Sequence, residues 1–143
     1  MLSKYRIWMW ASLFLSSTCL AGSAAQKTLN ELTSEKPGSP YHWVSDNAMG
    51  GKVMERVLSG TPGPTVADDT LKKDILANIG TFEEKAGGDK MPKLVEVRQL
   101  PKVRDEYNEV WVVSRAGQNI AYTVSLQSSA QGGVDFHVRG PWD

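Results

Sequence analysis

Apolar and polar residues alternate along the C-terminal part of the chain, which is typical of strands with one buried face. Short connections separate the alternating segments, including a tight turn at Ala116, Gly117 and Gln118. Such connections join neighbouring strands into an antiparallel meander. The pattern predicts four strands, at residues 94–100, 107–115, 119–127 and 134–139.

The alternation also assigns faces to the last two strands. The buried side of the fourth strand is expected to carry Val134, Phe136 and Val138. The residues between them then point to the opposite side. The polar face then carries Thr123 on the third strand and three polar residues on the fourth, namely Asp135, His137 and Arg139. In the second strand, residues 110–113 are all apolar, which predicts a central position. We expect Trp111 or a neighbour to show on the polar face.

Helical periodicity precedes the strands. Leu71, Ile75, Ile79 and Phe82 recur at intervals of three or four, which predicts a helix with one apolar face. Thr65 is its expected cap. A weaker pattern at residues 45–58 predicts a second helix, with its ordered part at 52–58. The expected fold class is therefore α+β, with one or two N-terminal helices packed on a four-stranded antiparallel meander sheet.

Ile75 and Phe136 are the expected core contacts between the main helix and the sheet. A single α+β domain is expected over residues 43–143. Residues 26–42 are polar and contain Pro37, Gly38 and Pro40, so we expect them to form a flexible lead-in.

The first 25 residues have the order of a secretory signal peptide. Lys4 and Arg6 precede an apolar run at residues 7–15, and small residues follow at 21–25. The run is shorter than the roughly 20 residues that a spanning helix needs, so we expect no stable membrane insertion after cleavage. The sequence predicts an exported protein, periplasmic or secreted.

Cys19 is the only cysteine of the chain. Bacterial lipoproteins carry lipid on a cysteine at this location, usually with Leu three positions earlier. Here Ser16 occupies that position and Leu15 lies one place too early. We therefore expect Cys19 to be one more residue of the signal, and a lipoprotein is the alternative. Removal of Cys19 leaves no cysteine for a disulfide, so stability must come from the hydrophobic core.

Charge and motifs exclude several classes of function. The chain has 16 basic and 16 acidic residues, and two of the basic ones belong to the signal. The remainder is mildly acidic, so we expect no nucleic-acid partner. Its two histidines, His42 and His137, are far apart, and no zinc or calcium pattern is present. We expect no metal and no cofactor.

The predicted polar sheet face is the candidate site. Trp111, Thr123, Asp135, His137 and Arg139 would form a patch for an unknown protein or small-molecule partner, since aromatic and Arg side chains dominate interface hot spots. This favours a small non-catalytic binding or accessory domain of inhibitor, immunity or envelope-assembly type. In the alternative, a small enzyme uses His137 and Asp135 as acid/base groups. An enzyme would hold this pair in a deep pocket, and a binding module would present it on an open face.

A helix followed by an antiparallel meander resembles the cystatin-like superfold, which NTF2-like domains share. Residues 112–119, at the middle hairpin, are similar to the first inhibitory loop of cystatins, and Pro141-Trp142 is similar to their Pro-Trp second loop. The cystatin motif is Gln-x-Val-x-Gly, and in the window ending at Gly117 its other fixed positions hold Val113 and Arg115. The resemblance therefore implies a fold class rather than protease inhibition.

We predict cleavage of the signal peptide between residues 21 and 27, because small residues follow the apolar run there. Mass spectrometry of the exported protein measures the new N-terminus. A lipid-modified Cys19 or an intact Met1 would contradict the prediction.

Overall fold

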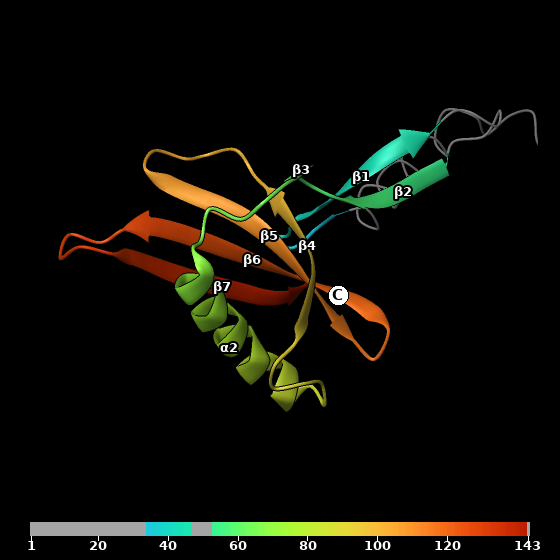
Figure 1. Ribbon diagram of the computed structural model, residues 1–143. Coiled ribbons are helices and arrows are strands. Elements are labelled where there is room, and N and C mark those ends of the chain that lie inside the picture. Colours follow the sequence, from blue (N-terminus) through green and yellow to red (C-terminus); the bar gives the residue numbers. More distant parts are fainter. Residues whose placement is uncertain (1–33, 47–52, 143) are drawn as a thin grey trace, which may run out of the picture. The chain divides into compact units, whose positions relative to one another are not determined.

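The computed structural model describes residues 34–46 and 53–142, so the signal peptide, its cleavage region and Cys19 lie outside the described residues. The described chain is mostly β. Its elements are β1 (Tyr41–Asp46), β2 (Val53–Leu58), β3 (Thr61–Pro62), α2 (Asp69–Lys85), β4 (Lys93–Gln99), β5 (Glu106–Arg115), β6 (Gln118–Ser128) and β7 (Val134–Trp142). β1 and β2 form a two-stranded sheet, and the other strands form a five-stranded sheet in the order β3-β4-β5-β6-β7 (Figure 1).

The predicted fold class of one or two helices on a four-stranded sheet is wrong. The structure describes one helix, a five-stranded sheet and a separate two-stranded sheet. Of the segment 45–58, expected to form a second helix, residues 47–52 lie outside the described residues. Residues 53–58 form strand β2, which pairs antiparallel with β1 so that Trp43 lies opposite Arg56. The added fifth strand, β3, has two residues, which is too short for any alternation to show. Strand pairing therefore overrides the weak helical spacing of Val53 and Val57.

The meander of β4 to β7 lies close to where the alternation predicts it. β5 pairs with β6 over its whole length, from Glu106 opposite Gln127 to Arg115 opposite Gln118. The turn between them has positive φ angles of 47° at Ala116 and 82° at Gly117. Two central residues with positive φ make the tight hairpin turn whose twist matches the flanking strands. This turn sets the register of the two central strands.

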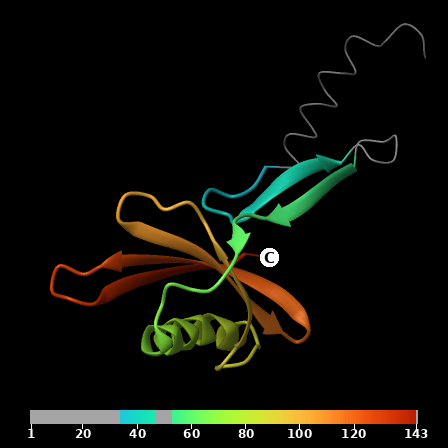
Figure 2. The same ribbon diagram turned by 45° about the horizontal axis from the view of Figure 1, so that its top comes forward.

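Helix α2 lies along one face of the five-stranded sheet (Figure 2). Its cap is Asp68 rather than the expected Thr65, since the Asp68 side chain accepts a hydrogen bond of 2.8 Å from the backbone N–H of Leu71. Gly80 is buried in the helix, and a Cβ there would lie 1.8 Å from the carbonyl oxygen of Lys90. Only glycine lets the chain after the helix pass this close on its way to β4.

Apolar side chains fill both faces of the sheet at its centre. We call the face under α2 the inner face and the opposite one the outer face. Between α2 and the inner face the buried residues are Ile75 and Ile79 of the helix and Val97, Trp111, Val113, Ile120, Tyr122, Val124, Leu126 and Val138 of the sheet. On the outer face Val110, Val112 and Ala121 are buried under Tyr41, Leu58, Leu100 and Trp142. β5 is therefore covered on both sides, which explains its continuous apolar run.

We predict that Ile75→Ala lowers the free energy of unfolding by roughly 2–5 kcal/mol, because Ile75 is fully buried between α2 and the sheet. Phe136→Ala is the comparison, and we expect a smaller loss because Phe136 is half-buried at the margin of the same cluster. Urea unfolding of both variants measures the difference. Wild-type stability of Ile75→Ala would show that the helix does not pack there.

Candidate functional site

Three polar residues of β7 face outward together, as the alternation predicts. Antiparallel pairing with β6 places Arg139 opposite Thr123 and His137 opposite Ser125. Asp135 lies opposite Gln127 in the same register. The side chains of Asp135, His137 and Arg139 are all exposed, and Thr123 is half-buried. The structure therefore brings four of the five predicted site residues onto one face of the sheet.

Trp111 is the exception, and its expected place on the polar face is wrong. It is fully buried on the inner face, where its indole N–H donates a hydrogen bond of 2.7 Å to Glu109. Val110 and Val112 occupy the outer face in its place. A continuous apolar run carries no alternation, so the sequence alone does not decide which of its residues face the helix.

The outer face has two unlike ends. At one end, residues from β1, β2 and the end of β7 cover the apolar centre. The indole N–H of Trp142 also donates a hydrogen bond of 3.3 Å to Thr123 Oγ1 there. At the other end lies an open depression of about 280 Å³. We call this depression the polar outer face. Its lining consists of Glu106, Ser125, Gln127, Asp135, Phe136, His137 and Arg139.

The polar outer face does not assemble a nucleophile with a base. Ser125 lies opposite His137, but its hydroxyl donates a hydrogen bond of 2.8 Å to the side-chain oxygen of Asn108. Asp135 and His137 are exposed and lie two residues apart on one strand. Nucleophilic catalysis needs a nucleophile within hydrogen-bond reach of its base, and this face does not provide that pair. The geometry instead presents charged and polar groups to solvent on an open surface.

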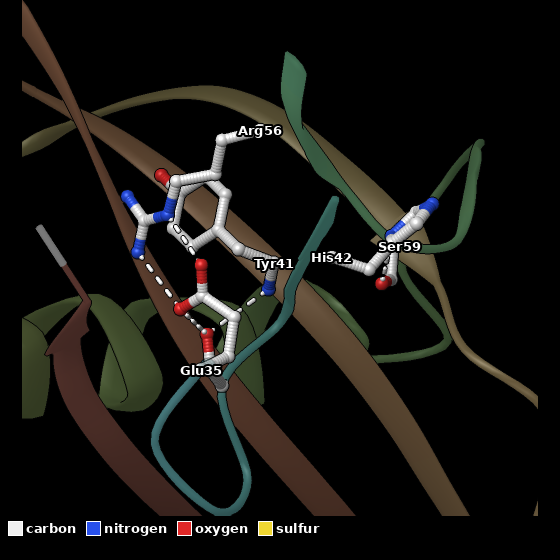
Figure 3. Close-up of polar contacts among 6 residues, drawn as sticks. Glu35, Tyr41, His42, Arg56 and Ser59 are labelled. Carbon is white, nitrogen blue, oxygen red and sulfur yellow. Dashed lines mark hydrogen bonds and ion pairs between the residues drawn. The ribbon is translucent and has the colours of Figure 1, made fainter. Parts of the chain in front are cut away.

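A second polar cluster ties the β1–β2 hairpin to the segment before it (Figure 3). The Glu35 carboxylate accepts two hydrogen bonds from Arg56, at 2.8 and 3.2 Å. The Arg56 guanidinium also lies 3.7 Å from the centre of the Tyr41 ring. The hydrogen bond from Arg56 is the main reason that the pKa of Glu35 lies below its ordinary value. These contacts hold Arg56 in place, and no local sequence pattern predicts them, because Glu35 and Arg56 are 21 residues apart.

The same hairpin brings His42 and Ser59 together. His42 Nδ1 lies 2.8 Å from Ser59 Oγ, and the two residues are 17 positions apart in the chain (Figure 3). An activated serine also needs a group that orients the imidazole. Within residues 34–46 and 53–142 the structure records no carboxylate against His42. The pair closes the base of the hairpin, where the Ser59 N–H also donates to the Pro40 carbonyl at 2.7 Å.

Glu83 is a fully buried acid at the C-terminal end of α2. Arg115 donates two hydrogen bonds to its carboxylate, at 2.6 and 2.7 Å, and the Tyr122 hydroxyl donates a third at 2.5 Å. The hydrogen bonds from Arg115 hold the pKa of Glu83 below its ordinary value and raise the pKa of Arg115. Burial is the main cause that raises the pKa of Tyr122. We call these three residues the clasp, because they join the helix to β5 and β6.

Glu109 is a second buried acid, on β5. Its carboxylate accepts hydrogen bonds from the Thr65 hydroxyl at 2.7 Å and from the Val66 N–H at 2.8 Å, in addition to that from Trp111. These bonds attach the segment that leads into α2 to the centre of the sheet. Both buried acids therefore have full sets of donors, and their role is to position the helix.

Among the described residues, no group of three or more His, Cys, Asp or Glu side chains lies close enough together to hold a metal ion. No helix in the described part of the chain is long and apolar enough to cross a membrane. No protein family, no curated protein and no solved structure matches the chain. The cystatin-like and NTF2-like resemblance therefore stays a prediction.

We predict that Glu83→Gln lowers the free energy of unfolding by about 3 kcal/mol at neutral pH, because it leaves Arg115 without its charge partner. The pKa of Glu83 is lower in the folded than in the unfolded chain, so its contribution is complete above its ordinary value of 4.5 and is lost as the pH falls through the folded value. The gap between wild type and variant should therefore narrow in acid.

Urea unfolding at pH 7 and at pH 3 measures this gap. Glu84→Gln is the matched control, because Glu84 is the exposed neighbour of Glu83 on the same helix. We expect the control to keep wild-type stability at pH 7. A constant gap at both pH values would contradict the role of the Glu83 charge.

Proposed function

We propose that the protein is a small exported binding domain, non-catalytic itself, that holds a partner on the polar outer face. One observation carries this proposal. The hairpin and Trp142 cover the apolar end of the outer face, and the polar end stays open. A sheet face left open beside a covered one is the surface on which a partner can dock without displacing any part of the fold.

The side chains on the polar outer face suit recognition of a polar partner. Asp135 and Arg139 carry opposite charges on one strand, with His137 between them. Arg is enriched among the residues that dominate binding energy at interfaces. Charges arranged in this way give orientation and partner choice, since a mismatched partner would meet like charges.

The alternative function is a small enzyme that uses His137 and Asp135 as acid/base groups. Such an enzyme encloses its substrate in a deep pocket that excludes water. The depression at these residues is open, and Ser125, the hydroxyl nearest in register to His137, donates to Asn108. These two observations support the binding domain over the enzyme.

Export supports the same proposal. A predicted signal peptide sends the domain to a compartment where accessory domains act on other envelope or secreted proteins. An inhibitor, immunity or envelope-assembly role would each use this open face to bind another protein. The chemistry of the face favours a protein partner with a charged, hydrogen-bonding surface.

We predict that the triple variant Asp135→Ala, His137→Ala, Arg139→Ala folds with near-wild-type stability but loses capture of its partner. Exposed substitutions usually change stability by about 0.5 kcal/mol or less each, and an Arg anchor contributes about 2 kcal/mol or more to binding. Pull-down from envelope extract, with thermal melting of each bait, measures both quantities.

The matched control replaces three exposed residues of α2 by alanine: Lys73, Asp74 and Asn78. We expect this control to capture the same proteins as the wild type. Equal capture by the β7 triple variant would show that the polar outer face is merely solvated.

A further inference from the structure

Strand β7 ends the five-stranded sheet among the strands that the structure describes. Its pairing with β6 is regular from Val134 to Arg139, and the register shift falls beyond Arg139, toward Trp142. A regular edge strand presents a row of backbone N–H and C=O groups on its free side. These groups form a template on which one further strand can pair.

The opposite side of the sheet is less suited to pairing. Strand β3 covers the end of β4 at Arg98 and Gln99. The rest of β4 has a register shift between Leu94 and Glu96. Such irregularities twist an edge away from a flat partner. β7 is therefore the more regular of the two edges.

The charge pattern of β7 is complementary to that of a second, antiparallel β7 strand. Residues 135–139 read Asp-Phe-His-Val-Arg, with an acid and a base placed symmetrically about His137. We propose that β7 pairs antiparallel with β7 of a second copy of this chain, about a two-fold axis at His137. Asp135 of each copy then lies opposite Arg139 of the other, so the pairing contains two opposite-charge pairs.

Other registers lose this complementarity. A shift by two residues places Asp135 opposite His137 or Pro141 in place of Arg139. A shift by one residue places outward side chains opposite inward ones. Parallel pairing in register brings equal charges together. Only the register centred on His137 pairs Asp135 with Arg139 on one common face.

The inner face supports the same register. Phe136 of one copy lies opposite Val138 of the other, so two apolar pairs form under the strands. On the other side, the two polar outer faces meet at the axis and become one surface. The proposal thus goes beyond the proposed function, because the second copy pairs with the β7 edge and leaves the polar outer face open. One strand pair makes a small interface, so we expect weak self-association.

Charge reversal tests the pairing. Asp135→Arg alone and Arg139→Asp alone each replace two attractive pairs by two repulsive ones, and we expect either to weaken self-association about tenfold or more. The double variant restores opposite charges in every pair, so we expect it to associate like the wild type. The protein is purified in the form that the producing cell accumulates. Analytical ultracentrifugation at concentrations up to about 1 mM then measures the dissociation constant of the dimer.

Each outcome decides the proposal. Similar dimer dissociation constants for wild type and double variant, with constants about tenfold or more higher for both single variants, support it. A monomeric wild type, single variants that associate as tightly as the wild type, or a double variant that stays monomeric overturns it. The control exchanges two exposed residues of α2, as Lys73→Asp with Asp74→Lys, and must dimerise like the wild type. Thermal melting confirms that every variant is folded.

A cysteine variant tests the register independently. The axis places residue 137 directly opposite its own copy, so we expect His137→Cys to form a disulfide-linked dimer on mild oxidation. Val134→Cys is the matched control, because residue 134 lies about 20 Å along the strand from its own copy in this register. Linking of the control but not of His137→Cys would overturn the register.

The proposed function and this inference fail separately. If wild type is monomeric but the β7 alanine variant loses capture of another protein, only the self-pairing is wrong. If self-association follows the charge reversals but that alanine variant captures its targets normally, only the binding role of the polar outer face is wrong.

Discussion

The ion pair of Glu83 and Arg115 is the interaction on which the arrangement of helix and sheet depends. A fully buried carboxylate is tolerated only where donors surround it, and here Arg115 and Tyr122 supply them from β5 and β6. The clasp holds the C-terminal end of α2 against the hairpin turn, and Glu109 holds the segment before the helix at the other end. With both ends attached, α2 stays on the inner face, and the outer face is left to other parts of the chain.

The outer face has a covered apolar part and an open polar part. Its apolar centre lies under Tyr41, Leu58 and Trp142, which come from opposite ends of the described chain. Burying this centre removes apolar area from water and keeps the sheet soluble. The polar end needs no such cover, because Ser125, Gln127 and the outward residues of β7 interact well with water. The division between the two ends thus follows from the side chains, and it sets where a partner has access.

Much of this architecture could be predicted from the sequence, and the failures have physical causes. Helix α2 and strands β4, β6 and β7 have clear periods, and β5 contains a continuous apolar run, so their positions follow from local pattern. The β1–β2 hairpin does not, because its stability comes from contacts such as that of Arg56 with Glu35, 21 residues away. Glu83 and Arg115 are 32 residues apart, and no local pattern connects them. The outward residues of β7 were assigned correctly by alternation, whereas Trp111 lies in a run without alternation.

The register shift in β4 bears on how many copies of the chain could join through the edges of the five-stranded sheet. A sheet that can pair with other copies at both of its edges produces an open-ended fibre. A sheet that can pair at one edge forms only a closed pair. With β3 over one end of β4 and the shift between Leu94 and Glu96, the second edge offers no regular template. If copies pair through β7, the irregularity on the far side of the sheet limits their assembly to a closed pair.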